Sequence, residues 1–188
     1  MKSKRNPQIN MLKKQKLSYG GELLKTRAGR THGRTLDTKN TMHMVLRSSL
    51  AKGSWSFSQP GNKQKVSKIF SKFSSKYGVK IYSVAYVGNH IHCQIKLSNR
   101  YAYFKFIRGL TAAIAMAISG ASRWNKNALK GKKFWDYRPF TRVVRGLKAV
   151  LNLKDYIHIN ELEGYGYHRE QARFIIGWRP LEGHYSRT

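Results

Sequence analysis

Residues 87–97 constrain the fold of this chain more than any other part of the sequence. After a Gly-Asn pair, polar and apolar residues alternate strictly over residues 90–97. This period of two predicts a strand with one face on a core and the other face polar. His90 and His92 share the polar face, where two neutral imidazoles at i and i+2 can bind one metal ion. The competing interpretation is a pair of polar residues on a solvated sheet face.

Hydrophobic periodicity places this strand in a mixed α/β domain. The Gly-Asn pair predicts a tight hairpin with the strand before it. Ser98-Asn99 predicts the N-cap of a long apolar helix, and Pro139 predicts an edge strand or a bulge. The predicted order is strand 41–47, helix 63–77, strand 79–87, strand 90–97, helix 100–119, strand 134–144 and helix 147–160.

Charge narrows the possible functions. The sequence has 37 Lys and Arg against 8 Asp and Glu, a formal net charge of +29. Such a chain binds polyanions, with nucleic acid as the default partner and a membrane surface as the weaker alternative. No acidic residue lies between Asp37 and Asp136. This gap argues against a nuclease with a carboxylate-held metal and against a glycosidase-type carboxylate pair around the histidines.

The chain divides into three predicted parts. Residues 1–40 are predicted to form a basic, flexible arm with little hydrophobic pattern, which either lies on a nucleic-acid backbone or serves as a solubilising or targeting tail. Residues 41–164 form the central domain, and residues 165–188 form an extension with one short helix. We find no apolar run long enough to cross a bilayer and no signal peptide, so we expect no membrane partner. The single Cys93 excludes an intramolecular disulfide and a Cys-based zinc site. The expected location is the bacterial cytoplasm, in association with the nucleoid.

A basic segment between the long helix and the fourth predicted strand is a candidate nucleic-acid surface. Its positive charges alternate with an aromatic ring, which suits unpaired nucleic acid because charges follow the backbone while a ring stacks on a base. The candidate nucleic-acid-binding residues in and beyond this segment are Arg123, Trp124, Lys126, Lys130, Lys132, Lys133, Arg138 and Arg142.

Three motifs in this order resemble the single-tyrosine HUH transposases, and among them the REP-associated tyrosine transposases most. They are Gly-Asn-His-Ile-His-Cys at residues 88–93, Phe-Trp-Asp at 134–136 and Asp-Tyr-Ile-His-Ile-Asn at 155–160. The resemblance runs from about residue 41 to residue 163. It implies a ferredoxin-like α/β (α+β) core, with an antiparallel sheet and helices on one face. It also implies cleavage and rejoining of single-stranded DNA next to a hairpin.

The resemblance also implies roles for individual residues. Tyr156 is the nucleophile, and His90, His92 and Asn160 hold Mg²⁺ or Mn²⁺. A bound cation withdraws charge from the scissile phosphate, and a phenol with a reference pKa of about 10 needs such a charge nearby. A covalent phosphotyrosine link conserves the bond energy, so the strand can be rejoined without ATP. We expect a monomer or a homodimer. His43 has two interpretations, a further site residue or a polar strand residue, and we favour the polar strand residue.

Three other functions stay open. A domesticated family member would bind structured DNA or RNA without cutting it. A ribosome-associated RNA-binding protein would account for the Lys, Arg and Gly content but gives no reason for the histidine pair. A replication initiator or relaxase shares the His-hydrophobic-His chemistry, usually with the tyrosine on another scaffold. Covalent attachment of a labelled oligonucleotide to the protein separates cleavage from binding.

Overall fold

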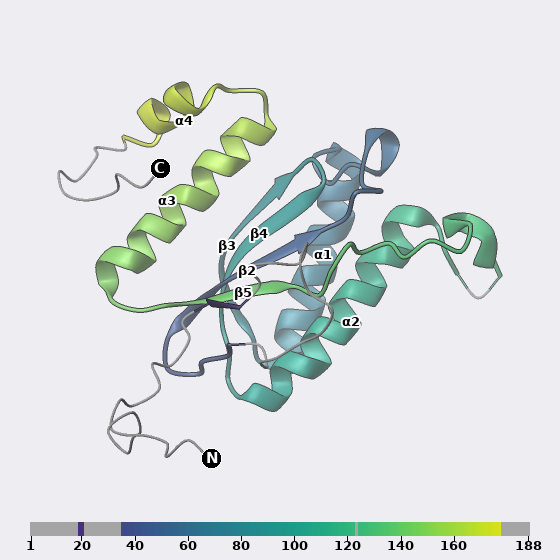
Figure 1. The fold of residues 1–188 in the computed structure, drawn as a ribbon, viewed down its shortest axis with the longest axis horizontal. Coiled ribbons are helices and arrows are strands. Elements are labelled where there is room, and N and C mark those ends of the chain that lie inside the picture. Colours follow the sequence, from purple (N-terminus) through teal and green to yellow (C-terminus); the bar gives the residue numbers. More distant parts are fainter. Residues whose placement is uncertain (1–18, 21–34, 123, 178–188) are drawn as a thin grey trace, which may run out of the picture.

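A computed structural model describes residues 19–20, 35–122 and 124–177 of the chain (Figure 1). Five strands form one antiparallel sheet in the order β1-β5-β2-β4-β3. The strands are β1 Tyr19–Gly20, β2 Thr41–Arg47, β3 Lys80–Val87, β4 His90–Lys96 and β5 Phe140–Val144. The helices are α1 Pro60–Tyr77, α2 Arg100–Ser119, α3 Leu147–Gly164 and α4 Arg169–Ile175, with short 3-10 turns η2 Gly53–Trp55 and η3 Lys126–Leu129.

The predicted hairpin between β3 and β4 is confirmed. Val87 pairs with His90 across the two-residue turn, and Gly88 takes a φ of 41°. β4 then pairs with β2 along nearly its whole length, from Arg47 opposite His90 to Met42 opposite Ile95. The paired-histidine strand therefore lies inside the sheet, with a partner on each side.

Helices α1 and α2 cover one face of the sheet (Figure 1). Met42, Met44 and Leu46 of β2 alternate onto this face, and all three are buried in the main core. Asn99 caps α2 as predicted, since its Oδ1 accepts from the backbone N–H of Ala102 at 2.7 Å. The two helices approach closely at Gly109, where a Cβ atom would collide with the ring of Phe73.

α2 is also long and apolar enough, by length and composition alone, to cross a membrane. This differs from the prediction that no apolar run in the sequence is long enough to cross a bilayer. The buried side chains of this helix, among them Phe106, Leu110 and Ile114, lie in the main core between the sheet and α1. The core helix of a globular domain meets the same length and composition criteria, so this feature is weak evidence of a membrane partner.

Helix α3 lies on the opposite face of the sheet (Figure 1). The predicted antiparallel α/β fold is confirmed, but the prediction put the helices on one face, and α3 is the exception. The reason is a second apolar cluster on that face, in which Leu153 and Ile157 of α3 pack on Ala85 and Val144. Gly164 permits the close approach of the last turn, because a Cβ there would lie 3.2 Å from the carbonyl oxygen of Tyr86.

The predicted strand at 134–144 is too long by six residues, since β5 begins at Phe140. The segment before it is fixed by other contacts. Asp136 accepts hydrogen bonds from the backbone N–H and hydroxyl of Ser49 at 2.7 and 2.9 Å, and the Trp135 indole N–H donates to the Thr111 carbonyl at 2.9 Å. Pro139 has no N–H to donate to a ladder. These anchors, rather than strand pairing, hold the Phe-Trp-Asp motif.

Candidate active site

Strand β4 presents His90 and His92 on the face that α3 covers. Their apolar neighbours Ile91 and Cys93 point into the main core and are fully buried. In the register, His92 stands between Val45 of β2 and Ala85 of β3. The two imidazoles are close, with ring centroids 4.8 Å apart and planes at 84°. The alternation in the sequence therefore predicted correctly that both rings lie side by side on one face of the strand.

Helix α3 brings Tyr156 against these imidazoles. Its ring centroid lies 5.4 Å from that of His92, with the planes perpendicular. The neighbouring Ile157 is fully buried in the second apolar cluster, between α3 and the sheet, and this contact fixes the rotation of the helix about its axis. Tyr156 itself keeps 37% of its surface exposed. The phenol is thus held beside the histidines but remains open to a substrate from solvent.

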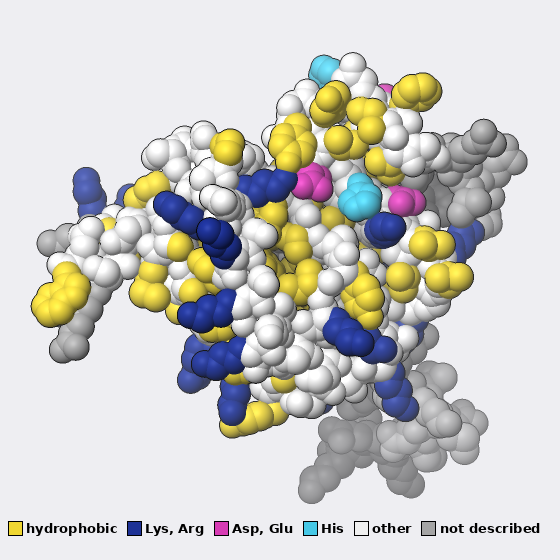
Figure 2. Space-filling view, turned by 180° about the vertical axis from the view of Figure 1, so that it is seen from behind, with side chains coloured by type: hydrophobic (Ala, Val, Ile, Leu, Met, Phe, Trp, Pro, Cys, Tyr) yellow, Lys and Arg dark blue, Asp and Glu magenta, His cyan; other side chains and the backbone are white. Residues whose placement is uncertain are grey.

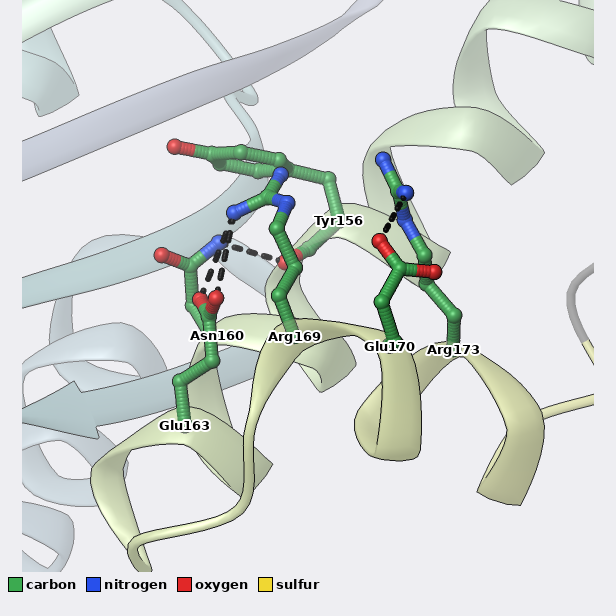
Figure 3. Close-up of polar contacts among 6 residues, drawn as sticks. All are labelled: Tyr156, Asn160, Glu163, Arg169, Glu170 and Arg173. Atoms are coloured by element: carbon green, nitrogen blue, oxygen red, sulfur yellow. Dashed lines mark hydrogen bonds and ion pairs between the residues drawn. The ribbon is translucent and has the colours of Figure 1, made fainter.

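Asn160 lies one helical turn beyond Tyr156 and is buried. Its side-chain Nδ2 donates to the backbone carbonyl of Tyr156 at 2.6 Å, which leaves the amide oxygen for another partner (Figure 3). Further along α3, Glu163 forms an ion pair with Arg169 of α4 at 3.2 Å. Figure 3 shows that Arg169 extends from α4 back toward the part of α3 that carries Tyr156 and Asn160.

The hydrogen-bonding state of the two histidines on β4 suits metal binding. His90 uses Nδ1 to contact Oδ1 of Asn89 at 2.9 Å, so its Nε2 is left for a ligand. Nε2 of His92 is buried and has no hydrogen-bond partner in the described part of the chain. Buried polar atoms are rarely left unpaired, so Nε2 of His92 is a candidate ligand for a bound metal ion. Two imidazole nitrogens and one amide oxygen are donors that Mn²⁺ accepts, and Mg²⁺ less readily.

Burial keeps the imidazoles neutral. It lowers the pKa of His92 to about 3, with the nearby His43 and His90 adding to the effect. Burial also lowers the pKa of His90, and Arg47 adds to it. Neutral imidazole is the form that binds a metal ion, so both rings are in the right state at pH 7. Within the described residues, no group of three His, Cys, Asp or Glu is placed to hold a metal ion, so any third protein donor is of another type, such as Asn160.

His43 is part of this cluster, contrary to its interpretation as an ordinary polar strand residue. It lies on β2, is buried, and places its Nε2 3.0 Å from Nδ1 of His92. Its ring also meets Tyr156 edge-on, with centroids 5.8 Å apart. In the sequence, His43 lies two residues from both Thr41 and Val45, which places it on the face of the first strand that points away from the main core. This position alone does not predict a contact with His92, because that contact depends on the pairing of β2 with β4.

Two arginines add positive charge to the same face. Arg47 stands directly opposite His90 in the register and is held by Asp136 at 3.6 Å. Arg142 of β5 stands opposite His43, and its charge adds to the burial that lowers the pKa of His43 to about 4. Arg142 was among the predicted nucleic-acid-binding residues, and the structure brings it to the site. Arg47 was not predicted.

Four of the other predicted nucleic-acid residues, Trp124, Lys130, Lys132 and Lys133, belong to a segment that lies away from this cluster. The basic segment around η3 lies beyond the end of α2, on the side of the molecule away from α3 (Figure 1). Trp124 is 90% exposed there, and Lys130, Lys132 and Lys133 are also exposed. Arg123 and most of the basic arm, residues 1–18 and 21–34, lie outside the described residues, as do the side chain of Lys126 and residues 178–188.

A sheet that presents paired histidines to a tyrosine on a crossing helix is the arrangement expected of the HUH class. The family described as "Transposase IS200 like" matches residues 38–160, about two thirds of the chain. The chain belongs to this family, as its motifs predicted. Membership makes it a DNA-cleaving enzyme of the transposase type. No curated protein sequence matches the chain.

Two solved structures are similar to this chain, and the first of them bears on the fold. The structure of a REP-associated tyrosine transposase bound to a REP hairpin is similar with a TM-score of 0.57 and 14% sequence identity, over 84% of this chain and 93% of that one. A candidate transposase from Deinococcus radiodurans R1 is similar with a TM-score of 0.43 and 13% identity, over 72% of this chain and 97% of that one. The first likeness supports the antiparallel α/β fold.

Proposed function

We propose that this protein cleaves and rejoins single-stranded DNA through a covalent bond to Tyr156, with the activity in residues 41–164. The observation that carries the proposal is the position of Tyr156, half-exposed and perpendicular to His92 at 5.4 Å. Tyr165, another tyrosine near the end of α3, is hydrogen-bonded to Lys63 instead. Tyr156 is therefore the phenol best placed for attack next to a bound cation.

Different residues of the chain would bind the metal ion, supply positive charge and attack the phosphate. His90, His92 and Asn160 would hold Mg²⁺ or Mn²⁺, which withdraws electron density from the scissile phosphate when bound. Arg47 and Arg142 add fixed positive charge for neighbouring phosphates. The Tyr156 oxygen forms a bond to phosphorus while the bond from phosphorus to the 3′ oxygen breaks. The phenol loses its proton to water, and the leaving 3′ oxygen takes one up. The reverse reaction rejoins the strand.

Single-stranded DNA beside a hairpin is the substrate that we propose. Lys and Arg side chains are spread over the face seen in Figure 2, where acidic side chains are confined to one end. This charge supports backbone binding in general. The similar REP-associated transposase is bound to a REP hairpin. We extend that substrate to this chain because the two share a fold.

A denaturing gel tests the proposal. Wild-type protein with Mn²⁺ and a labelled hairpin oligonucleotide should give a slow band that protease removes. Tyr156→Phe removes only the hydroxyl, so it should bind the oligonucleotide but give no such band, and Tyr165→Phe is the matched control that should still give it. Excess EDTA should abolish the band. A band of equal strength from Tyr156→Phe, or in EDTA, would refute the assignment.

A further inference from the structure

The contact between His43 and His92 joins two buried imidazoles from neighbouring strands. Their planes lie within 17° of each other and the ring centroids are 5.3 Å apart, while Nε2 of His43 and Nδ1 of His92 are 3.0 Å apart. The hydrogen and the lone pair of an imidazole both lie in its plane. The rings therefore meet edge to edge, in the geometry of one N–H···N hydrogen bond.

This bond determines what the far side of His92 can do. If Nδ1 of His92 donates, its Nε2 carries a lone pair and can bind a metal ion. If Nδ1 accepts, the hydrogen sits on Nε2, which is buried without a hydrogen-bond partner in the described chain. A buried N–H with no acceptor is more costly and rarer than the alternative. The first arrangement is favoured, and it makes His43 the acceptor.

His90 has the same arrangement with a different partner. The Asn89 side-chain oxygen lies 2.9 Å from its Nδ1, and an amide oxygen can only accept. His90 therefore also carries its hydrogen on Nδ1 and leaves Nε2 with a lone pair. Outer acceptors of this kind fix the orientation and tautomer of metal-binding imidazoles. Each histidine of the pair has its own acceptor, Asn89 for one and His43 for the other.

We propose that His43 is a positioning residue that holds His92 in the Nδ1–H tautomer and orients its ring for metal binding. The inference rests on the proposed function, since it assumes that His92 binds the cation. His43 also touches the Tyr156 ring edge-on. One buried side chain on β2 thereby sets the position of a proposed metal ligand and of the proposed nucleophile.

Direct metal binding tests this role in the full chain without DNA. His43→Leu removes the acceptor at similar size, and His43→Gln keeps an oxygen that can accept. By isothermal calorimetry with Mn²⁺, His43→Leu should bind about 10- to 100-fold more weakly than wild type, and His43→Gln should recover most of the loss. His158→Leu, which changes a histidine outside the cluster, should bind like wild type. Unchanged Mn²⁺ affinity in a folded His43→Leu variant would overturn the inference.

Nitrogen NMR of the metal-free protein gives a second, independent reading. Wild type should show His92 with its hydrogen on Nδ1, and this preference should weaken in His43→Leu and return in His43→Gln. A hydrogen on Nε2 of His92 in wild type would overturn the inference even if neither variant folds. The proposed function fails separately, if wild type binds no Mn²⁺ or if Tyr156→Phe still forms the covalent band.

Discussion

The two faces of the sheet are built for different purposes. The α1/α2 face holds the large core, in which Met42, Phe106 and Ile114 are fully buried. The α3 face has a small apolar cluster, and beside it lie the buried polar side chains of His43, His92, Gln94 and Asn160. Apolar burial stabilises a fold at about 25 cal/mol per Å², whereas buried polar groups gain little net stability. The α1/α2 face therefore contributes most of the folding stability. The α3 face contributes less, because polar side chains occupy part of its buried area.

The largest effect on stability is expected on the α1/α2 face. Phe106→Ala removes a fully buried ring from the core and should lower the free energy of unfolding by about 3–5 kcal/mol. Phe104→Ala is the matched control on the same helix, because Phe104 is 57% exposed and its loss should cost less than about 0.5 kcal/mol. Denaturant unfolding measures both. A loss below about 1 kcal/mol for Phe106→Ala would contradict this division of the faces.

The α3 face should be sensitive to acid in the metal-free protein. An unfolded histidine takes up its proton near pH 6.5, whereas burial lowers the pKa of His43 to about 4 in the folded protein. Between these values the unfolded state binds more protons, so stability is full above pH 6.5 and falls as the pH drops toward 4. The shift corresponds to a loss on the order of 3 kcal/mol for a single group.

Unfolding curves in EDTA at pH 7, 5.5 and 4.5 measure this loss. His43→Gln removes one of the titrating groups, so its stability should fall less steeply than that of wild type over the same range. His92 still titrates in that variant, and a smaller acid loss should therefore remain. Parallel curves for wild type and His43→Gln would show that the buried imidazole does not carry the acid sensitivity.

Some features of the two faces could be predicted from local sequence patterns, and others could not. Alternation alone predicted that His90 and His92 share a face, and hydrophobic spacing predicted α2 from Arg100 to Ser119. Alternation cannot say on which side of a sheet the next helix lies. The placement of the helices on one face came from the family resemblance, and α3 departs from it. His43 and His92 are 49 residues apart, and they meet only because β2 and β4 pair in one register. Such contacts follow from strand pairing rather than from local pattern.

The predicted strand before β5 failed for a related reason. Phe134 and Trp135 have the aromatic side chains that favour strands. Here Phe134 is buried in the main core, and its carbonyl accepts from the Ser48 hydroxyl, while Asp136 bonds to Ser49. Long-range anchors of this kind override local propensity, and no local pattern indicates them.

The smallest expected effect concerns the link between the two helix layers. Lys63 of α1 reaches past the edge strand β3, where its Nζ lies 5.7 Å from the Tyr86 ring, to an ion pair of 2.8 Å with Glu161 of α3. Both side chains are about 30% exposed, so solvent screens the pair. Lys63→Met keeps most of the stem and removes the charge, and it should cost about 1 kcal/mol or less. A double-mutant cycle with Glu161→Gln should give a coupling of about 0.5–1 kcal/mol.

Hydrogen exchange shows whether this link holds α3 against the sheet. In Lys63→Met the backbone amides of α3 should exchange faster, while those of α2 on the other face should not change. Glu170→Gln is the matched control, because it breaks the ion pair of 2.7 Å with Arg173 within α4 and touches no link between the layers. Faster exchange in α2 as well would mean that the two faces unfold as one unit. Equal exchange in α3 for both variants would mean that the small apolar cluster around Ile157 holds the helix without the ion pair.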